Sequence, residues 1–175
     1  MNVLAFGASN SQNSINKALA RYAGSLVDGN VELLDINDYE MPIYSADREQ
    51  ASGIPQEAQA FYDKIGQADG LIISFAEHNG NFTAAYKNLF DWTSRINQKV
   101  YQGKPAVFLS TSPGGHGASN VLAISTNSAP HFDADVKATL SVPAFYNNFD
   151  METGQITNAE IQSQLESALS KLSNV

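Results

Sequence analysis

The sequence contains no cysteine and few basic residues, and these two absences already exclude several classes of protein. Without cysteine, the 175-residue chain forms no disulfide, uses no thiolate in catalysis and binds no metal through sulfur. Such a composition fits a reducing compartment, and we predict a cytoplasmic protein. Ten lysines and arginines stand against 18 aspartates and glutamates, for a net charge of -8. Because nucleic-acid binding requires a basic surface, we expect no nucleic-acid partner.

Long apolar runs and metal-ligand patterns are missing as well. No stretch approaches the roughly 18 to 20 apolar residues that a membrane span requires, so we expect no membrane partner. The chain starts directly with the apolar residues 3–6, without the basic region and long apolar segment of a signal peptide. The histidines His78, His116 and His131 lack the spacing of zinc ligands. We therefore predict no metal site.

What the sequence does contain is an alternation of short apolar runs with longer segments of helical periodicity. With 43% hydrophobic and 16% charged residues, its composition is typical of one globular domain over residues 1–175. Five apolar runs predict strands at residues 3–6, 31–34, 71–75, 106–109 and 136–142. The second, third and fourth runs are apolar nearly throughout, which is typical of strands covered on both faces.

The segments between these runs repeat apolar residues at helical spacing. Such repeats predict helices over residues 15–26, 58–68, 85–96, 118–128 and 161–172. A long polar loop is predicted over residues 36–53. Strands that alternate with helices predict an α/β fold, a three-layer sandwich whose five-stranded parallel sheet has helices on both faces. Ligands of such sheets bind where the strand order reverses, which selects the loops after the first, third and fourth strands.

The loop after the first strand, residues 7–16, carries three serines and three asparagines and leads into a helix. Free N–H groups at a helix N-terminus bind phosphate, and hydroxyl groups add neutral donors. Serine and asparagine are also common helix caps, so the residues alone leave both interpretations open. The loop contains neither Gly-x-Gly-x-x-Gly nor Gly-Lys-Ser/Thr, which excludes the two best-known phosphate motifs.

Ser9, Ser14 and Asn16 in this loop have a recognisable spacing. It resembles the pattern Gly-Ser-x-Arg-x-x-Ser-x-Asn of the NADPH-dependent FMN reductase family, which includes flavin, quinone, azo-dye and chromate reductases. Ala8 and Ser11 stand in place of the glycine and the arginine of that pattern.

The other two loops resemble the same family. Residues 76–80 read Ala-Glu-His-Asn-Gly, which is similar to the family's flavin-ring loop Pro-Glu-Tyr-Asn-Gly. Residues 112–117 read Ser-Pro-Gly-Gly-His-Gly, which resembles its third loop, and weaker matches lie at residues 41–44 and 148–150. The three motifs follow the expected strands in the expected order. The resemblance implies a flavodoxin-like fold, bound FMN, and NADPH or NADH as electron donor.

The resemblance also implies which residues contact FMN. The phosphate is expected at Ser9, Ser11, Ser14, Ile15 and Asn16, with the side-chain amide of Asn16 as one donor. The flavin ring is expected along Ala76, Glu77, His78, Asn79 and Gly80. Its other end is expected beside Ser112, Gly114, Gly115 and His116. No catalytic side chain is implied, because hydride passes directly between nicotinamide and flavin.

Two functions remain open on this basis. One is an NAD(P)H-dependent FMN oxidoreductase that passes hydride to a flavin, a quinone or a similar small-molecule acceptor. The alternative is a flavodoxin-like electron carrier or flavin-binding protein without turnover. The resemblance further implies a homodimer or homotetramer, and Phe82, Tyr86 and Phe90, spaced four residues apart, are expected at a subunit contact. Trp92 is expected in the core and His131 at the surface.

Overall fold

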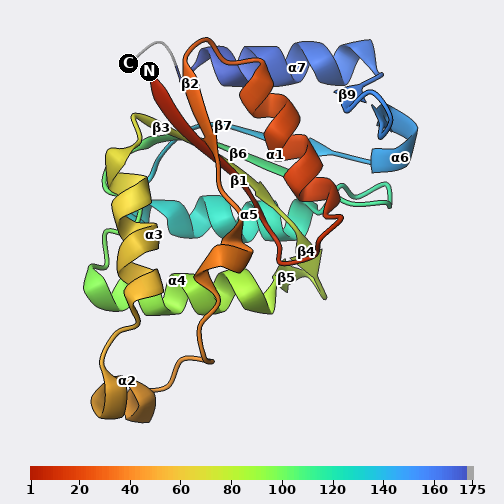
Figure 1. The fold of residues 1–175 in the computed structure, drawn as a ribbon. Helices are drawn as coiled ribbons and strands as arrows, with labels where there is room; N and C mark the ends of the chain where they lie inside the picture. Colours follow the sequence, from red (N-terminus) through yellow and green to blue (C-terminus); the bar gives the residue numbers. More distant parts are fainter. Residues whose placement is uncertain (173–175) are drawn as a thin grey trace.

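The structure, a computed structural model that describes residues 1–172, contains a five-stranded parallel sheet between two layers of helices (Figure 1). In spatial order the strands are β2 (Asn30–Leu33), β1 (Asn2–Ala8), β3 (Gly70–Phe75), β6 (Pro105–Thr111) and β7 (Asp135–Val142). All neighbouring strands pair in parallel. The strand order reverses between β1 and β3, as predicted, and the α/β sandwich inferred from the sequence is confirmed.

Helices cover both faces of this sheet (Figure 1). One face carries α1 (Ile15–Ser25) and α7 (Ala159–Ser170), and the other carries α3 (Gln56–Gln67), α4 (Ala84–Ile96) and α5 (Ser119–Ser128). Alternate residues of each strand point to opposite faces, so Val3 and Ala5 pack with α1 and α7 whereas Leu4 and Phe6 pack with α3 and α4. Each of these helices lies where the sequence predicts one.

The position of β2 differs from the prediction. The sequence predicts that the second strand is covered on both faces, but β2 lies at the edge of the sheet and none of its residues is fully buried. β1 lies inside the sheet, between β2 and β3, and all of its residues from Val3 to Ala8 are buried. The apolar content of a strand is a local property, whereas its place in the sheet follows from the order in which strands pair.

The predicted loop over residues 36–53 is also only partly irregular. It contains a short 3-10 helix, η1 (Ile36–Tyr39), and the helix α2 (Ala46–Ser52), which projects away from the rest of the domain (Figure 1). Asp35 and Ser45 cap these two helices with their side chains. No residue of α2 is buried. A helix that packs against nothing needs no apolar face, so its sequence carries no apolar periodicity that would predict it.

The remaining elements are too short for periodicity to reveal them. They are two hairpins, β4 (Glu77–His78) with β5 (Asn81–Phe82) and β8 (Phe149–Asp150) with β9 (Gln155–Ile156), the 3-10 helix η2 (Ala129–Phe132) and the single turn α6 (Phe145–Asn148). Within residues 1–172, the helices are all too short or too polar to cross a membrane.

Candidate functional site

The loop between β1 and α1 presents several hydrogen-bond donors at the carboxyl edge of the sheet. Ser14 caps α1, its Oγ accepting a backbone N–H of the first turn at 3.3 Å, and Ser9 Oγ accepts the Ser11 N–H at 3.2 Å. Because each hydroxyl acts as an acceptor here, its own O–H remains able to donate; Ser14 is half-buried, whereas Ser9 is only 1% exposed. The N–H groups of Ile15 and Asn16 have no acceptor within residues 1–172. Together these groups can bind a phosphate without a basic side chain.

The side chain of Asn16 has a different role from the one predicted. It is only 2% exposed. Its Oδ1 accepts the Ser74 hydroxyl at 2.7 Å and the Thr111 N–H at 3.1 Å, and its Nδ2 donates to the Thr111 carbonyl at 3.1 Å. The amide therefore joins α1 to β3 and β6 beneath the loops. Of Asn16, only the backbone N–H remains for a phosphate.

The second predicted loop is the hairpin of β4 and β5. Asn79 and Gly80 connect the two strands with φ values of +53° and +75°, the left-handed conformations that a type I′ turn requires. Ala76, before the hairpin, is buried, whereas His78 and Asn79 are exposed. The tight turn thus places the backbone of this loop just beyond the end of β3.

Glu77 connects this hairpin to α5. Its carboxylate accepts the Val121 N–H at 2.9 Å and a hydrogen of Asn120 Nδ2 at 3.2 Å. α5 begins after Ala118, which has a left-handed φ of +60° and makes no side-chain cap. Glu77 provides that cap from another loop, and its charge interacts favourably with the helix N-terminus. Its carboxylate is therefore engaged in the fold, which leaves the backbone of Glu77 for a ligand.

Thr83, a residue not predicted from the sequence, joins the first two loops. Its side chain is buried, and its Oγ1 donates to the Ala8 carbonyl at 2.9 Å and accepts the Tyr86 N–H at 3.2 Å. Threonine just before an amphipathic segment is a cap signal that the sequence offers. Its bond to the end of β1 is a tertiary contact that no local pattern indicates.

The glycines of the third loop have two distinct roles. Gly114 and Gly115 are exposed, and a Cβ atom at either position would meet no atom within 4 Å. Gly117 is buried with a φ of +56°, and a Cβ atom there would collide with Ser141 Oγ. Gly117 is thus needed for the fold, whereas the first two glycines leave open space beside the loop.

The segment after β7 supports this third loop. The Phe145 N–H donates to the Ser112 carbonyl at 3.0 Å, and the Ala144 N–H donates to the Gly114 carbonyl at 2.9 Å. His116 is exposed on the same loop. His131 is exposed in η2, after α5, as the sequence predicts.

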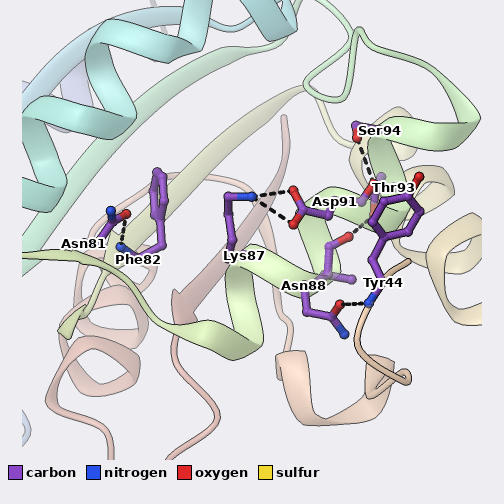
Figure 2. Close-up of polar contacts among 9 residues, drawn as sticks. Tyr44, Asn81, Phe82, Lys87, Asn88, Asp91, Thr93 and Ser94 are labelled. Atoms are coloured by element: carbon purple, nitrogen blue, oxygen red, sulfur yellow. Dashed lines mark hydrogen bonds and ion pairs between the residues drawn. The ribbon is translucent and has the colours of Figure 1, made fainter. Parts of the chain in front are cut away.

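Asn88 on α4 holds the segment that leads to α2 (Figure 2). Its Oδ1 accepts the Tyr44 N–H at 2.8 Å, and its Nδ2 donates to the carbonyls of Met41 at 3.0 Å and Pro42 at 3.1 Å. Trp92 Nε1 donates to the same Pro42 carbonyl at 2.7 Å, and the indole is buried as predicted. The weak family match at residues 41–44 therefore marks a segment fastened to α4.

Three kinds of loop meet at the switch point of the parallel sheet: a helix N-terminus with free donors, a tight hairpin and an open glycine turn. This combination is typical of an α/β protein that binds a mononucleotide. The chain belongs to the NADPH-dependent FMN reductase family, whose sequence profile matches residues 1–144. The resemblance inferred from the three loops is thereby confirmed. The predicted class of enzyme, an FMN-dependent oxidoreductase that uses NAD(P)H, agrees with this family.

Named relatives come from several bacteria. A 2-hydroxy-1,4-benzoquinone reductase from a Burkholderia species is 38% identical over 111 residues, which cover 62% of this chain and 58% of that protein. A quinone reductase from Escherichia coli strain K12 is 28% identical over 146 residues, 82% of this chain and 78% of that protein. An NAD(P)H-dependent FMN reductase from Pseudomonas aeruginosa is 34% identical over 119 residues, 67% and 63% of the two chains.

A solved structure supports the fold. FerB from Paracoccus denitrificans, described as a flavoenzyme NAD(P)H:(acceptor) oxidoreductase, superimposes with a TM-score of 0.77. The superposition covers 99% of this chain and 95% of that chain at 23% sequence identity. At this identity the likeness concerns the fold alone, and it confirms the flavodoxin-like sandwich.

Proposed function

We propose that this protein is an NAD(P)H-dependent oxidoreductase that binds FMN and passes hydride from nicotinamide through the flavin to a quinone or a similar acceptor. The observation that carries the proposal is the set of free N–H and O–H donors at the start of α1, at the same edge of the sheet as the open glycine loop at Gly114 and Gly115. The family of the chain and the printed activities of its relatives support it.

In this proposal the chain binds and orients, and FMN supplies the redox chemistry, taking up hydride from the dinucleotide and delivering reducing equivalents to the acceptor. The first turn of α1 with Ser9, Ser11 and Ser14 binds the phosphate, where neutral donors and the helix dipole offset its charge. The backbone of residues 76–80 borders the flavin ring. The N–H groups of the loop at residues 112–116 stabilise negative charge at the other end of the ring.

Buried and partly buried hydrogen bonds under the loops prepare this site before FMN binds. Asn16 joins α1 to β3 and β6, Thr83 joins α4 to β1, and Glu77 joins the hairpin to α5. Loops that are already ordered lose little conformational freedom on binding, so more of the contact energy appears as affinity. The missing arginine of the family pattern, replaced by Ser11, makes this preorganisation more important for holding the phosphate.

The test is anaerobic reduction of the purified protein loaded with FMN. We expect NADPH or NADH to bleach the oxidised flavin and a benzoquinone to restore it, and we expect extraction to return FMN and not FAD. Flavin that dithionite reduces but neither dinucleotide reduces would assign the chain to the electron carriers. A protein that binds no FMN would contradict the proposal altogether.

We further propose that the enzyme acts as a homodimer or homotetramer through the surface between α4 and α5, and that it acts in the cytoplasm. A cavity of about 220 Å³ lies there, and Phe82, Phe90, Ile124 and Phe132 provide its apolar lining. These aromatic side chains are half-buried, which suits contact with a second copy. Tyr86, predicted in the same contact, also lines this cavity, but its side chain belongs to the core and is only 2% exposed.

The Ser94→Arg variant tests this assembly. Ser94 also lines the cavity, and its Oγ donates to the Asp91 carbonyl at 2.8 Å on the α4 surface seen in Figure 2. We expect an arginine there to shift the protein towards monomer in light scattering. Ser170→Arg on α7 is the matched control, because Ser170 makes the same kind of bond, to the Ser167 carbonyl, on the opposite face. A native protein that is already monomeric would disprove the contact.

A further inference from the structure

A groove of about 510 Å³ runs along the outer side of α1, next to the proposed phosphate loop. Its polar lining includes Ser14, Lys17 and Arg21, which lie on one side of α1 because they are separated by three and four residues. Its apolar lining comes from Phe149 and Met151 in the β8–β9 hairpin, and Met151 is 52% exposed. The proposed FMN site uses Ser14 but neither of the two cations.

The two cations of this groove differ in how they are neutralised. Lys17 Nζ lies 2.7 Å from Asp35 Oδ1, and the lysine side chain is 18% exposed. Partial burial raises the pKa of Asp35, but hydrogen bonds from Lys17 and Asn37 outweigh it and leave that pKa below its usual value. Asp35 therefore stays ionised beside Lys17.

Arg21 is exposed, and within residues 1–172 no carboxylate lies within 4.0 Å of its guanidinium. Glu152 also lines the groove but forms no ion pair with it. In a chain with only ten basic residues and a net charge of -8, this unpaired arginine beside the proposed phosphate loop can bind a second anionic group.

We propose that this groove binds the adenosine end of the nicotinamide dinucleotide, with Arg21 donating to one of its phosphates and Met151 contacting the adenine. The inference rests on the proposed function. A dinucleotide whose nicotinamide lies against the flavin extends well beyond the ring, and the groove shares Ser14 with the proposed FMN site. The planar guanidinium binds phosphate in two-point geometry, and the polarisable thioether packs well against an aromatic base.

The experiment compares steady-state kinetics of Arg21→Ala with those of a matched control. Loss of a hydrogen bond to a charged group should raise the KM for NADPH by about tenfold or more, with kcat and FMN content unchanged. Lys99→Ala is the control, because it removes one exposed cation before the start of β6, at the end of the sheet opposite the loops, where Lys99 pairs with Asp133 at 3.8 Å. It should leave the KM for NADPH at the native value.

A truncated donor and a binding measurement separate a contact to adenosine from a general disturbance of the site. Reduced nicotinamide mononucleotide has no adenosine, so its KM should be the same for Arg21→Ala and the native protein. Calorimetry should show that adenosine 2′,5′-bisphosphate binds the native protein. Its affinity for the Arg21→Ala variant should be lower by about tenfold or more. A raised KM for both NADPH and NADH in Arg21→Ala supports a contact between Arg21 and the pyrophosphate. A raised KM for NADPH alone supports a contact between Arg21 and the 2′-phosphate.

Three results would overturn the inference. One is equal KM values for NADPH in Arg21→Ala and the native protein, and another is equal affinity for adenosine 2′,5′-bisphosphate. The third is loss of FMN from Arg21→Ala, which would assign the guanidinium to the FMN phosphate instead. Failure of the proposed function gives a different result, because neither dinucleotide would then reduce the flavin of the native protein, whereas calorimetry would still test the groove.

Discussion

Replacing Asn16 by alanine should lower the free energy of unfolding by about 3 to 5 kcal/mol, a large effect for a single substitution. The substitution leaves the Ser74 hydroxyl and both backbone groups of Thr111 without their partner in the interior. Each buried polar group without a partner costs about 1 to 3 kcal/mol, and the hydroxyl can turn to recover part of its share. Urea unfolding monitored by circular dichroism measures the loss.

Asn10→Ala provides the control, since Asn10 is an exposed asparagine of the same loop. Its free energy of unfolding should stay within about 0.5 kcal/mol of the native value. Native stability of Asn16→Ala combined with weak FMN binding would show that the amide binds the phosphate, as predicted from the sequence, and that the bonds to Ser74 and Thr111 matter little.

Gly7→Ala should destabilise the protein by roughly 3 kcal/mol or more and weaken FMN binding at the same time. A Cβ atom on Gly7 would lie 2.5 Å from the Lys17 nitrogen and 2.8 Å from the Asn16 carbonyl carbon. Both neighbours are backbone atoms of α1, so no side-chain rotation relieves the collision and α1 has to move. Because α1 carries the proposed phosphate donors, its displacement disturbs the site. Thermal unfolding and an FMN titration measure the two effects.

Gly114→Ala separates packing from ligand binding. A Cβ atom there meets nothing within 4 Å, so the free energy of unfolding should change by no more than about 0.5 kcal/mol. If the flavin lies against this loop, the added methyl group should nevertheless weaken FMN binding.

The Gly7→Ala prediction would be contradicted by a variant as stable as the native protein. Equal stability of Gly7→Ala and the native protein would mean that α1 shifts away without loss of packing.

The sequence alone was sufficient to predict the five strands of the main sheet and the helices that cover it. Apolar runs and helical repeats are local signals, so the strands and the main helices were found within a few residues of their bounds. The alternation of strands and helices then implied parallel pairing, and the rule of the switch point selected the loops after β1, β3 and β6. The match to the family over residues 1–144 confirms the family resemblance that the motifs in these loops indicated.

Only the tertiary structure decided what the individual polar side chains do. Asn16 bonds to Thr111, which lies 95 residues further along the chain, and Glu77 bonds to Val121 at a separation of 44 residues. A sequence pattern records residue type and spacing, and an asparagine beside a serine-rich loop has the same pattern whether its amide faces a ligand or the interior. The edge position of β2 and the unpaired Arg21 on the outer side of α1 were likewise invisible, because burial and charge pairing depend on which distant segments meet in space.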